Sequence, residues 1–378
     1  MSRHAILFFE TGLPASLPGV AQSTPWSLFP VWGNYRLFDI LYAGLADADD
    51  AGIDLFFFAP PDFQDPLKAA LSAWQLDADR RVRLLPATAG EWRSWLLQTD
   101  YDRLLVARSG DTPLFESRAV LNMFEQKSPA ACRLAVGESR VDFYLLPVKK
   151  LLGLLLDGKK HRPDDEWISD LFNRCLPSAI SAHRTLPGRL LLTGSPVEIV
   201  REHRRFLTGQ DMADYPTAFE RLRTRRPAEK EAYIGERGRV SESFIGAGAE
   251  IHGKVRNSVI FRDVFVEQDA EVVDSVVMSG NRIAREARIT NALIFPFLQS
   301  RPTLTCNIET RAAVGGTAKK QKNRDYPRLI FDSLTVVGAN VEIPADARIE
   351  EASFIAPDLP KNKLTRYTKV PRGMSVVA

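Results

Sequence analysis

The feature that most constrains this chain is a 17-residue repeat in its C-terminal part. Val255, Val272 and Ile289 are separated by steps of 17 residues. A fixed period of this length indicates a stack of similar coils, each of which buries its apolar side on the next. A set of β-hairpins would also alternate apolar and polar residues, but hairpins would not keep one register through three copies. The same step relates Ser258, Ser275 and Ala292, then Val259, Val276 and Leu293, and also Ile260, Val277 and Ile294.

The content of each repeat indicates the shape of a coil. About three short apolar stretches lie roughly six residues apart, as in a triangular, left-handed parallel β-helix of the hexapeptide type. Gly, Asn and Asp separate these stretches, and they suit tight corners that need left-handed backbone angles. The motif returns later, since "IGAGAEI" (245–251) matches "VGANVEI" (337–343). We therefore predict a β-helix over 233–378, with residues 299–330, which break the register, as an inserted loop.

The first two hundred residues have a different character. Uninterrupted apolar runs alternate with segments of helical periodicity, which predicts a parallel sheet covered by helices on both faces. The sequence "SPVE" (195–198) is typical of a capping box with proline in the first turn, so we expect a helix from there to about residue 207. The segment 221–232 is polar, basic and interrupted by proline. We predict an α/β domain over 1–212 and a linker over 213–232.

Composition excludes several classes of protein. The chain has 378 residues, a net charge of +3 and three cysteines that form no Cys-x-x-Cys motif. This cysteine usage disfavours a disulfide framework or a zinc ribbon and is typical of the reducing cytoplasm. The small charge, without a reading helix or interleaved aromatic residues, disfavours nucleic-acid binding. No apolar stretch approaches the length of a membrane span, and the run at 5–9 is too short for a signal peptide.

Several motifs resemble those of the ADP-glucose pyrophosphorylase family of sugar nucleotidyltransferases. The segment "FPVWGNYRLFDILYAGLADADDAGID" (29–54) is similar to the family's conserved arginine-aspartate core and the helix after it. "YDRLLVARSGDTPLF" (101–115) resembles the family's strand that ends in Gly-Asp, and "KVPRGMSVV" (369–377) resembles its closing coil. The resemblance implies a Rossmann-like nucleotidyltransferase domain in front of the left-handed β-helix.

The resemblance also implies roles for particular residues. Asp111 corresponds to the aspartate that binds the catalytic magnesium, so it is the candidate catalytic and metal-binding residue. Its alternative role is to cap the turn at the end of a strand. Arg36 and Asp39 match the arginine-aspartate core, but they are also a plausible pair at the start of a helix. The candidate substrate-binding residues are Gly33, Arg36, Asp39, Thr88 and Gly110.

The sequence departs from the family where phosphate would bind. The family's first strand leads into a glycine-rich loop whose amides and arginine hold the triphosphate. Here that segment is "FETGLPASLPG" (9–19), in which Glu10 adds a negative charge while Pro14 and Pro18 remove amide donors. Thr193 stands where the family has a second metal-binding aspartate, and the family's sugar-phosphate lysine has no counterpart.

These departures favour a catalytically impaired homologue that acts as a regulatory or structural subunit in glucan metabolism of the glycogen type. One alternative is an active nucleotidyltransferase that makes an NDP-sugar and pyrophosphate, with magnesium at Asp111. A second is a β-helix assembly module without small-molecule activity. A third is acyl transfer with His252 as the general base.

The partners follow from the same resemblance. We expect a homo-oligomer, or a hetero-oligomer with an active paralogue, and no nucleic acid or membrane partner. The basic segments 221–226 and 318–328 are candidate sites for an anionic effector, a nucleotide or a sugar phosphate. Their alternative is a role as solvated loops.

Overall fold

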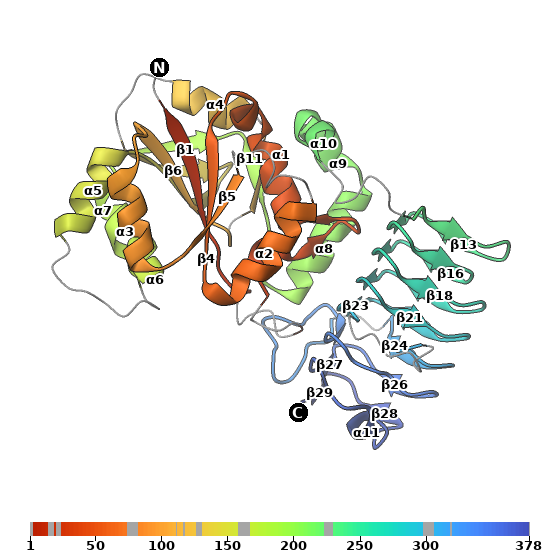
Figure 1. The fold of residues 1–378 in the computed structure, drawn as a ribbon. Helices are drawn as coiled ribbons and strands as arrows, with labels where there is room; N and C mark the ends of the chain where they lie inside the picture. Colours follow the sequence, from red (N-terminus) through yellow and green to blue (C-terminus); the bar gives the residue numbers. More distant parts are fainter. Residues whose placement is uncertain are drawn as a thin grey trace.

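The computed structural model describes residues 3–13, 19, 24–73, 82–110, 112–115, 118–125, 131–157, 167–222, 230–297, 306–317 and 320–377. Within these ranges, an N-terminal α/β part lies beside a C-terminal prism of parallel sheets (Figure 1). None of the helices in these ranges combines the length and the apolar character that a membrane span requires.

The α/β part is built on a seven-stranded sheet with the order β10-β8-β9-β6-β1-β4-β5. Its strands are parallel except β9, which is antiparallel to both of its neighbours. The expectation of a wholly parallel sheet was therefore wrong for this strand, because the turn at Gly137 and Glu138 is too short for a crossover and makes a hairpin. The strands are β1 (His4–Phe9), β4 (Asp54–Ala59), β5 (Val82–Pro86), β6 (Arg103–Arg108), β8 (Cys132–Val136), β9 (Ser139–Pro147) and β10 (Ala182–Leu186).

Helices cover both faces of this sheet. Ile6 and Phe8 of β1 pack in one buried cluster with α1 and α4, while Leu7 and Phe9 pack in another with α3 and α5. The predicted helix after Ser195 is confirmed as α8, and the Ser195 hydroxyl accepts a hydrogen bond from the Glu198 amide. The helices are η1 (Trp26–Leu28), α1 (Leu37–Asp50), α2 (Pro61–Ala73), α3 (Ala89–Gln98), α4 (Arg118–Glu125), α5 (Val148–Asp157), α6 (Trp167–Asp170), η2 (Leu171–Cys175), α7 (Leu176–Ala179), α8 (Pro196–Leu207), α9 (Gln210–Asp214) and α10 (Pro216–Arg221).

Two small antiparallel sheets complete the α/β part. They pair β2 (Pro30–Val31) with β3 (Tyr35–Arg36), and β7 (Thr112–Phe115) with β11 (Gly188–Leu191).

The C-terminal part is a parallel β-helix of the hexapeptide type, as predicted. Val255 pairs with Val272, and Val272 pairs with Ile289, so the 17-residue step is the register between coils.

Three parallel sheets form the sides of the β-helix. The first sheet contains β12 (Tyr233–Ile234), β15 (Glu250–Ile251), β18 (Phe265–Val266) and β21 (Arg282–Ile283). The second contains β13 (Arg239–Ser241), β16 (Lys254–Arg256), β19 (Glu271–Val273), β22 (Arg288–Thr290), β24 (Ala313–Gly315), β26 (Arg348–Ile349) and β28 (Lys369–Val370). The third contains β14 (Phe244–Ile245), β17 (Val259–Ile260), β20 (Val276–Val277), β23 (Ala292–Ile294), β25 (Thr335–Val337), β27 (Phe354–Ile355) and β29 (Ser375–Val376). The short helix α11 (Lys361–Leu364) lies near its C-terminal end (Figure 1).

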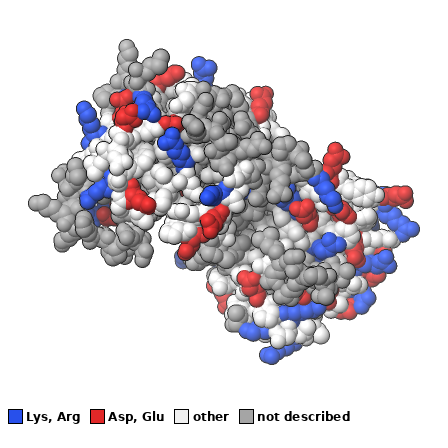
Figure 2. All heavy atoms as spheres, viewed as in Figure 1, with Lys and Arg blue, Asp and Glu red and all other residues white. Residues whose placement is uncertain are grey.

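The corners of the coils have the backbone that their residues predicted. Asn257, Asp274 and Asn291, which are 17 residues apart, have φ of 46°, 53° and 48°. These short polar side chains tolerate the left-handed region better than most residues. Asn257 Nδ2 also donates to Asp274 Oδ1 at 2.7 Å, so one corner is tied to the next. Acidic and basic side chains are interspersed over the visible face of the prism (Figure 2).

The segment expected to be an inserted loop contributes to the prism in part. Ile308 forms bridges with both Ile283 and Ile343, and β24 pairs with β22 and β26. Residues 306–315 are therefore a coil of the stack rather than a loop. The 17-residue step did not reveal this coil because the connections on either side of it differ in length from those of the earlier coils.

The outer face of the third sheet packs against the α/β part. One buried cluster contains Trp32, residues of α8, and Val259 and Phe261 of the β-helix. Gly33 lies at this junction with φ of 78°, and a Cβ at this position would be 2.4 Å from the ring of Phe244. The expected division at 212 and 233 stays a proposal, and linker residues 223–229 lie outside the described residues.

His203 holds this junction in its neutral form. The Trp32 amide donates to Nε2 at 3.1 Å, and Nδ1 lies 2.6 Å from the Ile199 carbonyl oxygen. Nε2 therefore carries the lone pair and Nδ1 carries the proton. The ring is 0% exposed and lies 5.3 Å from the ring of Phe261. Burial lowers the pKa of His203 to about 4.

We expect acid to destabilise this junction. The unfolded chain protonates His203 near its ordinary pKa of 6.5, whereas the folded protein resists protonation until about pH 4. The stability that His203 contributes is present above pH 6.5 and is lost as the pH falls toward 4. This linkage removes about 2–3 kcal/mol between pH 7 and pH 4.5. Urea unfolding at the two pH values measures it, and His203→Gln should flatten the pH dependence. Equal pH dependence in both proteins would contradict the assignment.

Candidate functional site

The sheet order places a candidate ligand site at the carboxyl ends of β1 and β6. From β1 the chain moves first to β4 on one side and later to β6 on the other. In open α/β sheets, ligands bind in the crevice at such a switch in strand order. The residues that follow the two strands are Glu10 and Thr11 after β1, and Ser109 and Gly110 after β6.

These residues bind one another through a closed set of hydrogen bonds. The Ser109 hydroxyl donates to Glu10 Oε1 at 2.9 Å. The amides of Thr11 and Ser27 donate to the same oxygen at 3.1 and 3.3 Å. The Thr11 amide also lies 3.0 Å from the Ser109 hydroxyl oxygen. The donors that end β1 and β6 are therefore directed at a side chain of the protein itself.

Glu10 is a buried carboxyl group. It is 1% exposed, and within the described part of the chain its buried Oε2 has no hydrogen-bond partner. Burial raises the pKa of Glu10, although its hydrogen bonds to Ser27, Ser109 and Thr11 oppose this. A carboxyl group in this position repels phosphate when it is ionised and occupies the amide donors in either form.

The chain after β1 uses its backbone amides internally. Gly12 forms an antiparallel bridge with Pro25, the Leu13 amide donates to the Thr24 carbonyl oxygen, and the Trp26 amide donates to that of Thr11. A phosphate-binding loop leaves such amides free to approach an anion. The Pro14 and Pro18 positions of this loop lie outside the described residues.

Several of the predicted site residues make contacts within the protein that stabilise the fold. The Arg36 amide donates to Asp39 Oδ2 at 2.7 Å, so the two residues form the expected pair at the start of α1. Thr88 caps α3 and accepts from the Glu91 amide at 3.2 Å. Gly110 lies beside Thr11, because a Cβ on this glycine would be 3.7 Å from the Thr11 hydroxyl oxygen.

Of the predicted site residues that the structure describes, only Gly110 lies beside the Glu10 cluster. Thr88 follows β5, two strands away in the same sheet, and Gly33 lies at the junction with the β-helix. The catalytic and metal-binding candidate Asp111 lies outside the described residues. Substrate binding by Gly33, Arg36, Asp39, Thr88 and Gly110 therefore stays a prediction.

The described residues do not provide a magnesium site. No group of three or more His, Cys, Asp and Glu side chains among them is placed to hold a metal ion. Thr193, at the position of the family's second metal ligand, is buried, and its hydroxyl has no partner in the described part of the chain. Magnesium binding consequently rests on Asp111 alone and stays a proposal.

Aromatic side chains fill the space on one face of the sheet near this edge. The centre of the Trp92 ring lies 5.1 Å from the ring centres of both Phe9 and Phe58, and 6.2 Å from that of Trp167. Trp167 donates from Nε1 to the Ala87 carbonyl oxygen at 3.1 Å. Trp92 and Trp167 therefore pack in the core of the α/β part.

Next to Thr193, a buried ion network joins β11 to α8 and α9. Arg189 Nη1 donates to Glu202 Oε2 at 2.7 Å, and Arg189 Nε donates to Asp211 Oδ1 at 2.8 Å. Arg205 donates to the same Asp211 oxygen at 2.8 Å. Burial alone would raise the pKa of Asp211, but the two guanidinium groups hold it below its usual value. Sequence analysis missed this network because its members carry no recognisable motif.

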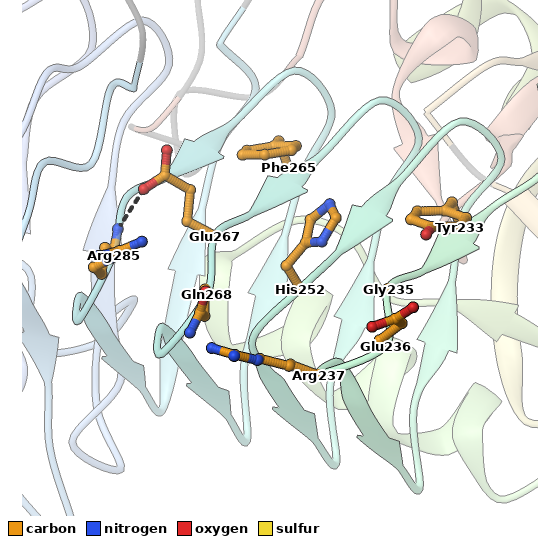
Figure 3. Close-up of a pocket in the computed structure, with 9 residues that line it drawn as sticks. All are labelled: Tyr233, Gly235, Glu236, Arg237, His252, Phe265, Glu267, Gln268 and Arg285. Carbon is orange, nitrogen blue, oxygen red and sulfur yellow. Dashed lines mark hydrogen bonds between the residues drawn. The ribbon is translucent and has the colours of Figure 1, made fainter.

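Sequence analysis also missed a groove on the first coils of the β-helix (Figure 3). Tyr233, His252 and Phe265 lie along it, and only His252 had been considered. The signal that could have revealed it is the recurrence of ring-bearing residues at outward-facing positions of successive coils.

The fold is that of a mixed α/β sheet domain followed by a hexapeptide β-helix. A family model described as "GlmU-like, C-terminal hexapeptide" matches residues 227–329. The chain is 31% identical over 137 residues to a glucose-1-phosphate adenylyltransferase of Acetivibrio thermocellus. The aligned residues make up 36% of this chain and 30% of the relative. It is 42% identical over 74 residues to the Bacillus cereus (strain Q1) enzyme of the same name, and these 74 residues make up 20% of each chain.

These comparisons confirm the resemblance as similarity over part of the length. The chain is related to glucose-1-phosphate adenylyltransferases and carries a GlmU-like hexapeptide domain. The matches span between 20% and 30% of the length of these curated relatives.

Proposed function

We propose that this chain is a catalytically impaired homologue of glucose-1-phosphate adenylyltransferase that acts as a regulatory or structural subunit in glucan or sugar-nucleotide metabolism. The observation that carries the proposal is the buried carboxyl group of Glu10 at the carboxyl end of β1. The similarity to adenylyltransferases supports the class of protein, and the closed cluster around Glu10 supports the loss of activity.

When Glu10 is ionised, its carboxylate opposes the binding of a nucleotide at this edge. Two like charges about 4 Å apart repel each other by roughly 4 kcal/mol at the effective dielectric constant of a protein surface. Phosphoryl-type transfer depends on positioning and on stabilising negative charge rather than on covalent help from the protein. The chain lacks a glycine-rich loop, and the amides of Thr11 and Ser27 already bind Glu10. We therefore infer that turnover is lost or very slow.

The proposed role includes a partner. The resemblance to the ADP-glucose pyrophosphorylase family implies a homo-oligomer, or a hetero-oligomer with an active paralogue. An anionic effector at the basic segments 221–226 and 318–328 belongs to the same proposal, although residues 223–229 and 318–319 lie outside the described residues. Magnesium at Asp111 belongs to the alternative in which the enzyme is active.

Pyrophosphate release tests the proposal. The purified chain is incubated with magnesium, glucose 1-phosphate and each of the common nucleoside triphosphates. We expect release at the level of the blank while circular dichroism shows a folded protein. In a second arm, the same assay contains an active glucose-1-phosphate adenylyltransferase of the same cell. We expect the added chain to change the rate or the effector response of that enzyme.

Two results would contradict the proposal. Release clearly above the blank that disappears in Asp111→Asn would show a working active site with a rebuilt phosphate loop. An unchanged rate and effector response in the second arm would argue against the role of a subunit for that enzyme.

A further inference from the structure

An open groove crosses the outer face of the first β-helix sheet, far from the sheet of the α/β part. Its volume is about 540 Å³, within the range of small-molecule sites. It lies along β12, β15 and β18 at the N-terminal end of the prism (Figure 3). The residues that line it are Tyr233, Gly235, Glu236, Arg237, His252, Phe265, Glu267, Gln268 and Arg285.

One side of the groove is a ladder of rings from three successive coils. The ring of His252 lies 5.8 Å from that of Tyr233 and 5.5 Å from that of Phe265. The Arg282 guanidinium lies 4.6 Å from the centre of the Phe265 ring and covers one end of the ladder. Tyr233 at the other end is 54% exposed. The ladder therefore places three rings along the groove, of which Tyr233 is exposed while His252 and Phe265 are half-buried.

The position of His252 depends on a glycine in the preceding coil. A Cβ on Gly235 would lie 2.5 Å from His252 Nδ1 and 3.0 Å from its Cε1. The lack of a side chain at this position allows the imidazole ring to lie across the coil between Tyr233 and Phe265. The ladder is thus a built arrangement that one added methyl group would disturb.

The other side of the groove carries balanced charges. Glu236 and Arg237 come from one corner, and Glu267 and Arg285 come from later ones, so two carboxylates and two guanidinium groups line this side. Glu267 is held in place, because its carboxylate accepts from the Arg285 amide at 2.8 Å and from the Cys306 thiol at 3.6 Å. Neither the Arg237 nor the Arg285 side chain has an ion-pair partner among the described residues.

We propose that this groove binds a neutral oligosaccharide. The faces of aromatic rings are electron-rich and attract the weakly positive C–H groups on the flat side of a sugar ring. Carboxylates accept hydrogen bonds and guanidinium groups donate them, so the opposite rim matches hydroxyl groups that do both. A ligand without net charge fits the two opposing pairs of charges, whereas a phosphate group would gain from the arginines and lose to the glutamates. The spacing of rings over successive coils suits a ligand of more than one sugar unit.

Saturation-transfer NMR on the full chain tests this site. The probes are maltohexaose, cellohexaose and xylohexaose, with ATP and glucose 1-phosphate as charged alternatives. We expect transfer to at least one neutral oligosaccharide and weaker or no transfer to the charged probes. Tyr233→Ala should weaken binding by about two- to tenfold, the range expected for the loss of one aromatic contact.

Matched variants separate a binding role from a structural one. Gly235→Ala should weaken binding while the fold is kept, because the clash falls on the end of a flexible side chain. His183→Ala, an exposed histidine of β10, should bind like the unaltered chain. Absence of transfer to all three oligosaccharides would overturn the proposal. Equal transfer in Tyr233→Ala, or stronger binding of ATP or glucose 1-phosphate at the same residues, would also overturn it. The site is independent of the proposed loss of adenylyltransferase activity, so either proposal can fail without the other.

Discussion

Replacement of Arg189 by methionine is expected to lower the free energy of unfolding by about 3–5 kcal/mol, the usual cost of leaving a buried charge without its partner. The guanidinium group bonds both Glu202 and Asp211, and both of these carboxylates are buried. Methionine keeps much of the aliphatic volume but leaves the two negative charges close together. Urea unfolding followed by tryptophan fluorescence measures the loss.

Two variants check this explanation. Arg205→Met removes the more exposed of the two arginines that bond Asp211, so its effect should be clearly smaller. The triple variant Arg189→Met, Glu202→Leu, Asp211→Leu should recover much of the lost stability, because it leaves no unpaired charge. Equal losses from Arg189→Met and Arg205→Met would contradict the central position of Arg189 between the two buried carboxylates.

Replacement of Trp32 by alanine is expected to cost about 3–5 kcal/mol, as for other large buried aromatic residues. Trp32 is 0% exposed and lies between the rings of Phe206 and Phe219. The centre of its ring is 5.2 Å from that of Phe206 and 5.3 Å from that of Phe219. It also belongs to the cluster that joins the α/β part to the β-helix. The alanine variant should therefore unfold at lower urea concentration and should weaken the junction as well as the core.

The conservative variant separates ring packing from hydrogen bonding. The indole Nε1 of Trp32 is buried and has no hydrogen-bond partner among the described residues. Trp32→Phe keeps a ring between the two phenylalanines and removes this unpaired donor, so its loss should be well below that of the alanine variant. Similar losses in both variants would mean that the stacked rings contribute little.

The intact scaffold and the altered phosphate region support different conclusions. The described residues form the seven-stranded sheet and the stacked coils of the β-helix, as the resemblance to sugar nucleotidyltransferases implied. At the carboxyl end of β1, however, the amides of Thr11 and Ser27 bind the carboxyl group of Glu10. The closed cluster around Glu10 is the observation on which the proposed loss of turnover rests.

Much of the fold was predictable because its signals are local or periodic. The 17-residue step predicted the register between Val255, Val272 and Ile289, since each coil must repeat the burial of the one below. The left-handed corners at Asn257 and Asp274 followed from residue type alone. The coil at 306–315 escaped prediction because connections of variable length conceal a fixed period.

The sites depended on contacts that no local pattern contains. Glu10 is buried because Ser109, 99 residues later, donates to its carboxylate at the neighbouring strand end. Sequence alone established that a negative charge replaces a glycine-rich loop after β1, together with the β-helix and its repeat. Only the tertiary structure decided that this carboxyl is sealed from water, and that Tyr233, His252 and Phe265 form one open ladder. Burial and ring stacking are set by residues from distant segments, and their positions are determined only when the sheets assemble.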